Sequence, residues 1–234
     1  MENLRIATWN IGNSYFRLWE NNRKVNYVIG LLEIYQPDIL SLQELSPIVV
    51  KKINKRLIES GSQYKITAGY EKSINPIKNL MVTNNIVISN LLPVTKSIIP
   101  LSHKHNLVSQ ILDGNISINN TSLDNTNDML NKVQMNKVVR NLRVKVDRNF
   151  DTILTATLNK KPIEFNMFDF NRKLNDIELK VVENRHSTYK GHSDIYPIDY
   201  VIIPDSWEIE NVQTLNADFE FTSHYPVIVD VKRR

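Results

Sequence analysis

The 234-residue chain contains no cysteine, so it can form neither a disulfide framework nor a thiolate metal site. It also has no apolar run approaching the ~20 residues that a helix needs to span a bilayer. The opening "MENLRIATWN" has neither the basic segment nor the long apolar segment of a signal peptide. These absences favour a cytoplasmic protein, while a secreted, toxin-like protein fits them only if the sequence is a mature chain.

The sequence also lacks a Gly- or Ser-rich linker, an internal repeat and a low-complexity tract. Hydrophobic residues make up 41% and charged residues 23%, as in an ordinary globular protein. We therefore expect one domain over residues 1–234. The net charge of +4 and the pI of about 9.1 favour an anionic partner such as nucleic acid, or serve only solubility.

Short apolar runs alternate with helical patterns along the whole chain. Helical spacing of apolar residues predicts helices before Pro37, after Ser46 and over 126–142, and a short helix between 160 and 180. Runs rich in β-formers predict strands over 4–11, 38–44, 63–69, 85–90, 94–99, 107–124 (a hairpin), 151–159, 196–204 and 225–231. Many strands with few helices favour a four-layer α/β sandwich, with two packed mixed sheets flanked by helices.

Five short strings resemble, in the same order, the motifs of the endonuclease/exonuclease/phosphatase superfamily, the fold of DNase I and exonuclease III. They are "ATWNIG", "PDILSLQE", "NNIVISNLLPV", "IDYVI" and "SHYPVIVDV". The resemblance covers nearly the whole chain and implies Mg²⁺-dependent phosphoester hydrolysis. Within the superfamily, "QELSPI", "VISNLL" and "TSHYPVIVDVKRR" are similar to the nuclease subunit of cytolethal distending toxin.

The resemblance implies a metal site at Asn10 and Glu44, whose amide and carboxylate oxygens suit Mg²⁺. It also places Asn159 and His224 among the catalytic residues. Asp199, in "IDYV", is expected to form hydrogen bonds near the same site.

Three positions depart from the family pattern. Ser122 stands where the family has a histidine, Thr157 stands where it has an aspartate, and Ser223 replaces the aspartate before His224. A hydroxyl group cannot act as a base near pH 7 or carry a charge beside a phosphate. The sequence therefore favours a silent or weak catalyst that is retained to bind nucleic acid or a protein partner.

A competing alignment keeps one of these carboxylates. Asp169 lies in "FDFN", which matches the family's "DFN", and would support an active Mg²⁺-dependent nuclease or phosphatase. The alignment through "ATLN" is preferred because "DTILTATL" is the better buried strand. Both alternatives stay open at this point.

Four further residues have open roles. Asp218 or Glu220 is a candidate for the acidic partner that His224 lacks in its own motif. Lys160 and Lys161 follow Asn159 and either approach nucleic acid or are plain solvated lysines.

Overall fold

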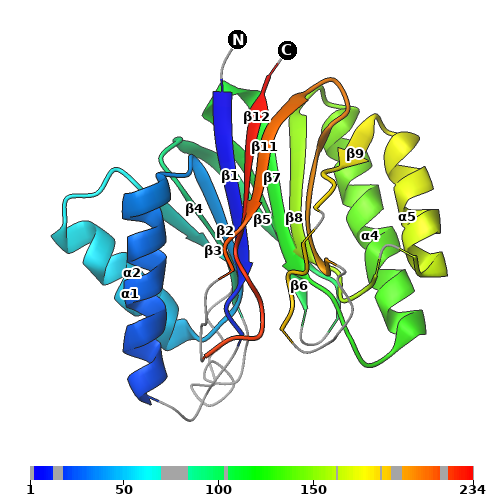
Figure 1. Cartoon of the computed structure of the whole chain (residues 1–234). Coiled ribbons are helices and arrows are strands. Elements are labelled where there is room, and N and C mark those ends of the chain that lie inside the picture. Colours follow the sequence, from blue (N-terminus) through cyan, green and yellow to red (C-terminus); the bar gives the residue numbers. More distant parts are fainter. Residues whose placement is uncertain are drawn as a thin grey trace.

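The computed structural model describes residues 3–12, 18–69, 84–102, 105–161, 163–184, 186–190, 197–216 and 221–233. Two sheets lie face to face in the middle of the molecule, and helices cover the outer side of each sheet (Figure 1). The predicted four-layer α/β sandwich is therefore confirmed.

The first sheet contains six strands, β1 (Asn3–Asn10), β2 (Ile39–Leu45), β3 (Lys65–Ala68), β4 (Asn84–Ser89), β11 (Glu208–Thr214) and β12 (Val227–Lys232). Their order across the sheet is β11-β12-β1-β2-β4-β3. β1 is parallel to β2 and antiparallel to β12, so the last strand of the chain lies beside the first.

The second sheet also contains six strands, β5 (Pro93–Pro100), β6 (Asn106–Leu112), β7 (Ile116–Ser122), β8 (Asp151–Thr157), β9 (Leu179–Val181) and β10 (Asp199–Pro204). Their order is β5-β6-β7-β8-β10-β9. The predicted hairpin is β6 and β7, joined by a short turn in which Gly114 has a φ of 75°. Glycine adopts this left-handed conformation without the steric cost that a side chain brings.

Four helices are described, α1 (Leu18–Tyr35), α2 (Pro47–Glu59), α4 (Asp128–Val146) and α5 (Phe165–Asn175). α1 and α2 cover the first sheet, and α4 and α5 cover the second (Figure 1). α2 begins as predicted, because the hydroxyl of Ser46 accepts a hydrogen bond from the backbone of Val49 and Pro47 is the first helical residue. None of the described helices is long and apolar enough to cross a membrane.

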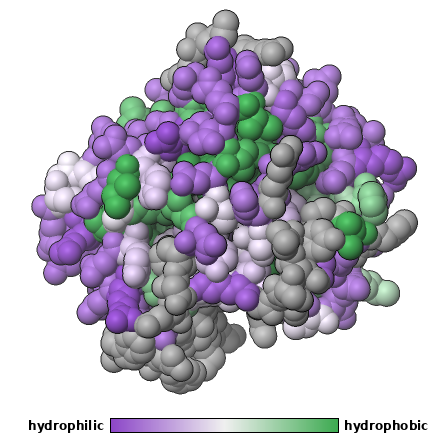
Figure 2. Space-filling view, viewed as in Figure 1, coloured by the Kyte–Doolittle hydropathy of each residue, from purple (hydrophilic) through white to green (hydrophobic). Residues whose placement is uncertain are grey.

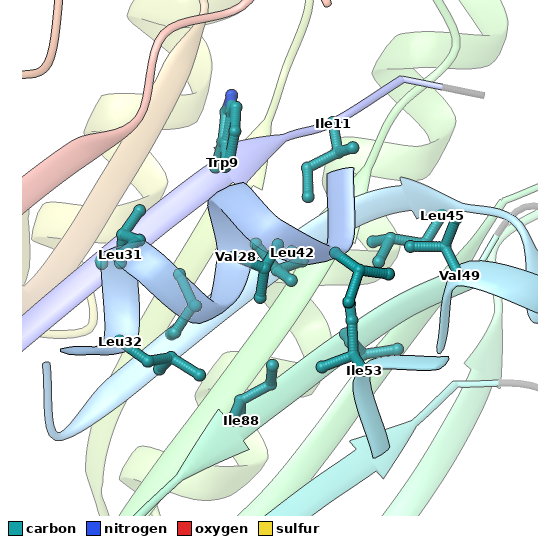
Figure 3. Close-up of a cluster of buried hydrophobic side chains, with 14 of the residues drawn as sticks. Trp9, Ile11, Val28, Leu31, Leu32, Leu42, Leu45, Val49, Ile53 and Ile88 are labelled. Carbon is teal, nitrogen blue, oxygen red and sulfur yellow. The ribbon is translucent and has the colours of Figure 1, made fainter. Parts of the chain in front are cut away.

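The central strands β1, β2 and β4 of the first sheet are largely buried on both faces, with alternate side chains pointing to opposite sides. On β1, Trp9 points toward α1 and α2, where it joins an apolar core with Val28, Leu42 and Ile53 (Figure 3). Ile6, on the other face of β1, belongs to the core between the two sheets. This alternation also decides where the polar residues of β1 point: Thr8 and Asn10 share the inner face with Ile6.

Polar side chains also lie between the two sheets. The amide nitrogen of Gln43 donates to Thr8 at 2.8 Å and to Asn120 of the second sheet at 2.7 Å. Asn120 in turn donates to the carbonyl oxygens of Leu42 and Ile86. Asn120 therefore links the sheets by hydrogen bonds, which a buried amide requires to offset its desolvation.

The strand β11 was not predicted from the sequence. It lies at the edge of the first sheet, and residues 208–211 are exposed to solvent, so it lacks an apolar pattern. Hydrophilic side chains cover most of the face seen in Figure 2, interrupted by smaller hydrophobic areas.

Candidate active site

Most of the family-like residues line one cavity of about 500 Å³. Six of the positions singled out in the sequence share this cavity, namely Asn10, Glu44, Asn159, Lys161, Ser223 and His224. The described residues that line it are Asn10, Gly12, Glu44, Asn125, Asn159, Lys161, Glu164, Tyr189, Ile198, Phe221, Thr222, Ser223 and His224.

Glu44 reaches the cavity because β2 is irregular just before its end. Leu42 points toward the helices, and strict alternation would place Glu44 on that same apolar face. Instead the pairing of β2 with β4 shifts register after Leu42, and Glu44 has a φ of 60°. A bulge of this kind redirects a side chain, and the carboxylate of Glu44 accepts a hydrogen bond from the amide of Asn10 at 3.0 Å.

Asn10 is held in one orientation by bonds to both ends of its amide group. Its nitrogen donates to Glu44 and, at 3.2 Å, to the hydroxyl of Thr157 on the second sheet. Its side-chain oxygen accepts from the backbone of Gly12 at 2.9 Å. Gly12 has a φ of 67°, a conformation that glycine adopts readily.

A buried lysine, Lys24 of α1, binds the backbone of Gly12, just after β1. Its ammonium group donates to the carbonyl oxygen of Gly12 at 2.7 Å, and only 2% of the residue is exposed. Burial lowers the pKa of Lys24 to about 8, although the charges of Glu20 and Glu44 favour the protonated form. Lys24 thus adds a partly titrating positive charge beside Glu44.

His224 and Asp199 form a buried pair. Nδ1 of His224 lies 2.9 Å from a carboxylate oxygen of Asp199, and their side chains are 11% and 1% exposed. Burial lowers the pKa of His224, but the charge of Asp199, their hydrogen bond and the charge of Glu44 outweigh this and raise the pKa above its ordinary value. Nδ1 therefore donates to Asp199.

The sequence placed the missing acidic partner of His224 close by in the chain, at Asp218 or Glu220. Both lie outside the described residues, and the structure shows that Asp199, on β10, takes this role. The substitution at Ser223 therefore leaves the histidine paired. β10 and the residues before β12 come together only in the folded chain, so spacing along the sequence did not reveal the pair.

The segment 188–190 supports this pair from one side. The hydroxyl of Thr188 accepts from the backbone of Asp199, and the carbonyl of Thr188 accepts from the backbone of Tyr225. The ring of Tyr189 meets the ring of His224 edge-on, with centroids 5.1 Å apart. Trp9 donates from its indole nitrogen to the carbonyl of His224 at 3.1 Å. Backbone and ring of the histidine are thus both held.

Thr157 lies in the middle of the site. Its hydroxyl donates to Asp199 at 2.5 Å and accepts from Asn10 at 3.2 Å. The hydroxyl therefore connects Asn10 of the first sheet to Asp199 of the second. Thr157 fills the position at which the resemblance implies a carboxylate, and its hydroxyl proton is engaged in the hydrogen bond to Asp199.

Asn159 and Ser122 lie near Thr157 in the fold. Asn159 lines the cavity with a φ of 55°, and its amide donates to the carbonyl of Leu123 at 2.7 Å. Ser122 pairs with Thr157 in the sheet but does not line the cavity, and 2% of it is exposed. His105 bonds the carbonyl oxygen of Ser122 at 2.9 Å.

Asp169 does not face the cavity. The string that contains it forms the helix α5, and its carboxylate is bound by Arg172 at 2.9 Å and by Lys173 at 2.5 Å. "DTILTAT" is the buried strand β8, so the loop that follows it carries Asn159. The geometry thus agrees with the alignment through "ATLN".

The two lysines after Asn159 differ from each other. Lys160 is 7% exposed and pairs with Asp128 of α4 at 2.5 Å and with Glu164 at 3.2 Å. It therefore joins the first turns of α4 and α5. Lys161 lines the cavity and adds a positive charge to its wall.

The donor set fits a magnesium ion held by one carboxylate. Among the residues that the structure describes, no three His, Cys, Asp or Glu side chains form a group that could hold a metal ion. Mg²⁺ is commonly bound through one or two carboxylates together with substrate phosphates. Glu44 offers such a carboxylate, and the oxygen of Asn10 has a second lone pair besides the one that accepts from Gly12.

Sequence reasoning missed Lys24, Thr188, Tyr189 and Phe221 as parts of the site. Lys24 lies on a helix with apolar neighbours at helical spacing, and Phe221 directly precedes the string "TSHYPVIVDVKRR" without belonging to it. The one available signal was Lys24 itself, a charged residue one position before Val25 on the buried face of α1.

The sequence matches no protein-family model and no curated protein sequence. Many solved structures match the fold. The human Nocturnin catalytic domain is 18% identical with a TM-score of 0.76, and the match covers 98% of this chain and 93% of that one.

Two further structures match over nearly their full lengths. The mannosyl-6-phosphatase of Bacteroides thetaiotaomicron VPI-5482 is 13% identical with a TM-score of 0.77, covering 98% of this chain and 100% of that one. D. rerio TDP2, complexed with a single-strand DNA product, is 12% identical with a TM-score of 0.73, covering 100% of each chain.

Another match is a protein of Bacteroides thetaiotaomicron described as an endonuclease/exonuclease/phosphatase family protein, at 13% identity and a TM-score of 0.73, covering 98% of this chain and 97% of that one. Identities this low establish shape but not activity. Together with the two six-stranded sheets, these matches show that the chain has the DNase I-like endonuclease/exonuclease/phosphatase fold.

Proposed function

We propose that this protein binds phosphate esters together with a divalent cation in the cavity between Glu44 and His224, and hydrolyses them slowly. The observation that carries this proposal is the buried pair of His224 and Asp199 in the same site as Glu44 and Asn10. Burial disfavours the charged form of His224, and the carboxylate of Asp199 favours it, so the pair keeps a histidine of raised pKa beside Glu44 and Asn10.

When it is protonated, the ring of His224 gives the site a hydrogen-bond donor for a phosphate oxygen. Because Nδ1 donates to Asp199, Nε2 is the ring nitrogen that remains for the ligand. Lys161 adds positive charge to the cavity wall. Donors that are fixed before the ligand arrives stabilise the charge that develops on a phosphate during hydrolysis.

Glu44 and Asn10 would hold the divalent cation. When bound, Mg²⁺ polarises the phosphate and offsets the charge that builds up on it. The chain's own contribution is to keep the two oxygen ligands in place, through the bond from Asn10 to Glu44 and the bond from Gly12 to Asn10.

The rate is proposed to be low because a threonine stands where the resemblance implies a carboxylate that would act as a base. Thr157 occupies that position, and its hydroxyl cannot accept a proton near pH 7. Loss of one positioned acid–base group typically costs ~10²–10⁴ in rate. His224 keeps its acidic partner, so we propose a weak catalyst rather than a fully silent site.

The names of the similar structures support a phosphate ester as the ligand class. One is a mannosyl-6-phosphatase, and another holds a single-strand DNA product. The net charge of +4 agrees with an anionic ligand. A protein partner is the second possibility left by the sequence, and the experiment below separates it from a phosphate ester.

The test is a single-turnover assay with protein in excess over a 5′-labelled single-stranded oligonucleotide and, separately, over p-nitrophenyl phosphate. Both are run with Mg²⁺, with Mn²⁺ and with EDTA, and binding of the oligonucleotide is measured in parallel by polarisation at two salt concentrations. We expect binding that weakens with salt and slow, metal-dependent hydrolysis.

Glu44→Gln is the informative variant, because it keeps the shape of the side chain and removes its charge. Glu33→Gln, at a helix position away from the cavity, is the matched control. Metal-dependent hydrolysis should disappear in Glu44→Gln alone. If the wild-type protein binds neither ligand in any metal, the proposal is wrong and a protein partner becomes the better explanation of the conserved shape.

A further inference from the structure

Phe221 lines the cavity, and two further aromatic side chains, Trp9 of β1 and Tyr27 of α1, contact it. The ring centroid of Phe221 lies 5.8 Å from that of Trp9 and 5.4 Å from that of Tyr27. We call Phe221 and Tyr27 the aromatic surface, because Trp9 beneath them is 1% exposed whereas Tyr27 is 46% exposed.

The aromatic surface adjoins the proposed phosphate site. Phe221 lines the same cavity as Glu44 and His224. It is three residues before His224, and the intervening Thr222 donates from its hydroxyl to the carbonyl of Asn10 at 2.9 Å. A ligand whose phosphate lies between Glu44 and His224 therefore has Phe221 within the same cavity.

The ring of Phe221 is held by its neighbours. Trp9 and Tyr27 contact it at tilted angles, and the ammonium group of Lys24 lies 5.8 Å from its centroid. A ring that is fixed in advance loses little conformational entropy when a flat ligand stacks on it. Nearby positive charge also favours a ligand that carries phosphate next to its flat group.

We propose that the aromatic surface stacks an unpaired base next to the bound phosphate, which makes single-stranded nucleic acid the preferred ligand of the site. The proposal rests on the proposed function, since the phosphate must bind in the cavity. Proteins that bind single strands combine positive charge along the backbone with aromatic rings on which bases stack. A base inside a duplex has both faces covered, so a base must be unpaired to stack on a protein ring.

Tyr27 differs from Phe221 in how much of its ring is exposed to solvent. Phe221 packs against the apolar core beneath α1, whereas Tyr27 lies outside that core and keeps nearly half of its surface in solvent. Since Tyr27 contacts Phe221, which lines the cavity, its exposed ring extends the aromatic lining to the surface of α1.

The experiment compares two labelled oligonucleotides of equal length, oligothymidylate and the same chain with abasic spacers, so that only the bases differ. Both are titrated by fluorescence polarisation with the intact protein in Ca²⁺, which limits hydrolysis. We expect the wild-type protein to bind oligothymidylate about 5- to 150-fold more tightly than the abasic chain.

Two variants test the aromatic surface. Tyr27→Ala removes an exposed ring, and Phe221→Leu keeps apolar volume while it removes the flat face. Tyr27→Ala should bring the two dissociation constants together by weakening oligothymidylate alone, and Phe221→Leu should weaken oligothymidylate more than the abasic chain. Phe168→Ala is the control, because Phe168 is 61% exposed on α5 and does not line the cavity.

The outcomes separate the two proposals. Equal binding of both oligonucleotides by the wild-type protein, or an unchanged difference in both variants, overturns the stacking proposal and leaves phosphate binding intact. Binding of neither oligonucleotide overturns the proposed function and the stacking proposal with it. A variant that weakens both oligonucleotides equally has lost its structure or its phosphate site, and that result also counts against stacking.

Discussion

Replacing Asp199 by asparagine isolates the charge that keeps His224 protonated. In the native site one oxygen of Asp199 accepts from Thr157 at 2.5 Å and the other accepts from His224 at 2.9 Å. In Asp199→Asn the remaining oxygen can still accept from Thr157. The amide nitrogen then faces Nδ1 of His224, and two donors cannot share one hydrogen bond.

The ring of His224 must therefore give up the proton on Nδ1, and its pKa falls below its value in the native protein. Hydrogen bonds to charged groups contribute roughly 1.5–3 kcal/mol, which corresponds to about a 10- to 150-fold loss in affinity if His224 contacts the phosphate as a cation. Burial of the histidine adds to the effect, because it disfavours the charged ring once Asp199 is neutral.

The assay measures oligonucleotide affinity in Mg²⁺ from pH 5.5 to 8.5. The native protein should keep its affinity above the ordinary pKa of histidine, 6.5, because the pKa of His224 is raised. The Asp199→Asn protein should lose affinity at a lower pH. Asp205→Asn is the matched control, since it removes the same charge from a side chain that is 70% exposed and remote from the cavity. A pH profile that is the same for Asp199→Asn and the native protein would refute the reasoning.

Four further outcomes follow from the same contacts. Thr157→Asp should raise the single-turnover rate of hydrolysis by about 10²–10⁴, and Thr157→Asn is a control of equal size. An unchanged rate in Thr157→Asp would show that the hydroxyl of Thr157 is not what limits hydrolysis. The pair of His224 with Asp199 should stabilise the protein fully below pH 6.5, and this contribution should be lost as the pH rises through the raised pKa of His224. Urea unfolding of the native protein and of His224→Gln measures it, and a difference in free energy of unfolding that does not change with pH would contradict the prediction. Because the pKa of Lys24 is lowered in the folded protein, the unfolded chain binds more protons at this lysine than the folded chain between about pH 8 and 10.5. The free energy of unfolding of the native protein should therefore rise with pH in this range relative to Lys24→Met. A difference between the two proteins that stays constant with pH would contradict the burial of the charge. Asn120→Leu leaves the amide of Gln43 without one acceptor and should lower the free energy of unfolding by about 1–3 kcal/mol; no loss would mean that water replaces the bond.

Much of the fold could be predicted because the buried strands carry local apolar patterns. β8, β10 and β12 are short segments rich in apolar and β-branched residues, and the start of α2 is marked by Ser46 and Pro47. The edge strand β11 has one partner and an exposed surface, so no local pattern marks it.

Only part of the site could be predicted from the sequence. Asn10, Glu44, Asn159 and His224 follow from the resemblance and line one cavity. The pairing of His224 with Asp199 joins residues 25 positions apart and depends on how two sheets meet, which spacing cannot show.

Asparagine is frequent along the whole sequence, and no local pattern there shows what the individual residues do. The structure buries several of them between the sheets and beneath the helices, where Asn120 bonds the carbonyls of Leu42 and Ile86 and Asn131 bonds the carbonyl of Leu158. A buried amide and an exposed amide look the same in a sequence. Their different roles appear only once the neighbouring strands are in place.

The central claim is that Glu44 and Asn10 form a working site for a divalent cation and a phosphate ester. Its most direct test is isothermal titration of Mg²⁺ into the native protein and into Glu44→Gln, each with and without a saturating phosphate ester. Because the site offers one carboxylate, we predict weak Mg²⁺ binding alone, tighter binding with the ester, and loss of both in Glu44→Gln. Mg²⁺ binding that is absent from the native protein under both conditions, or that is unchanged in Glu44→Gln, would contradict the account.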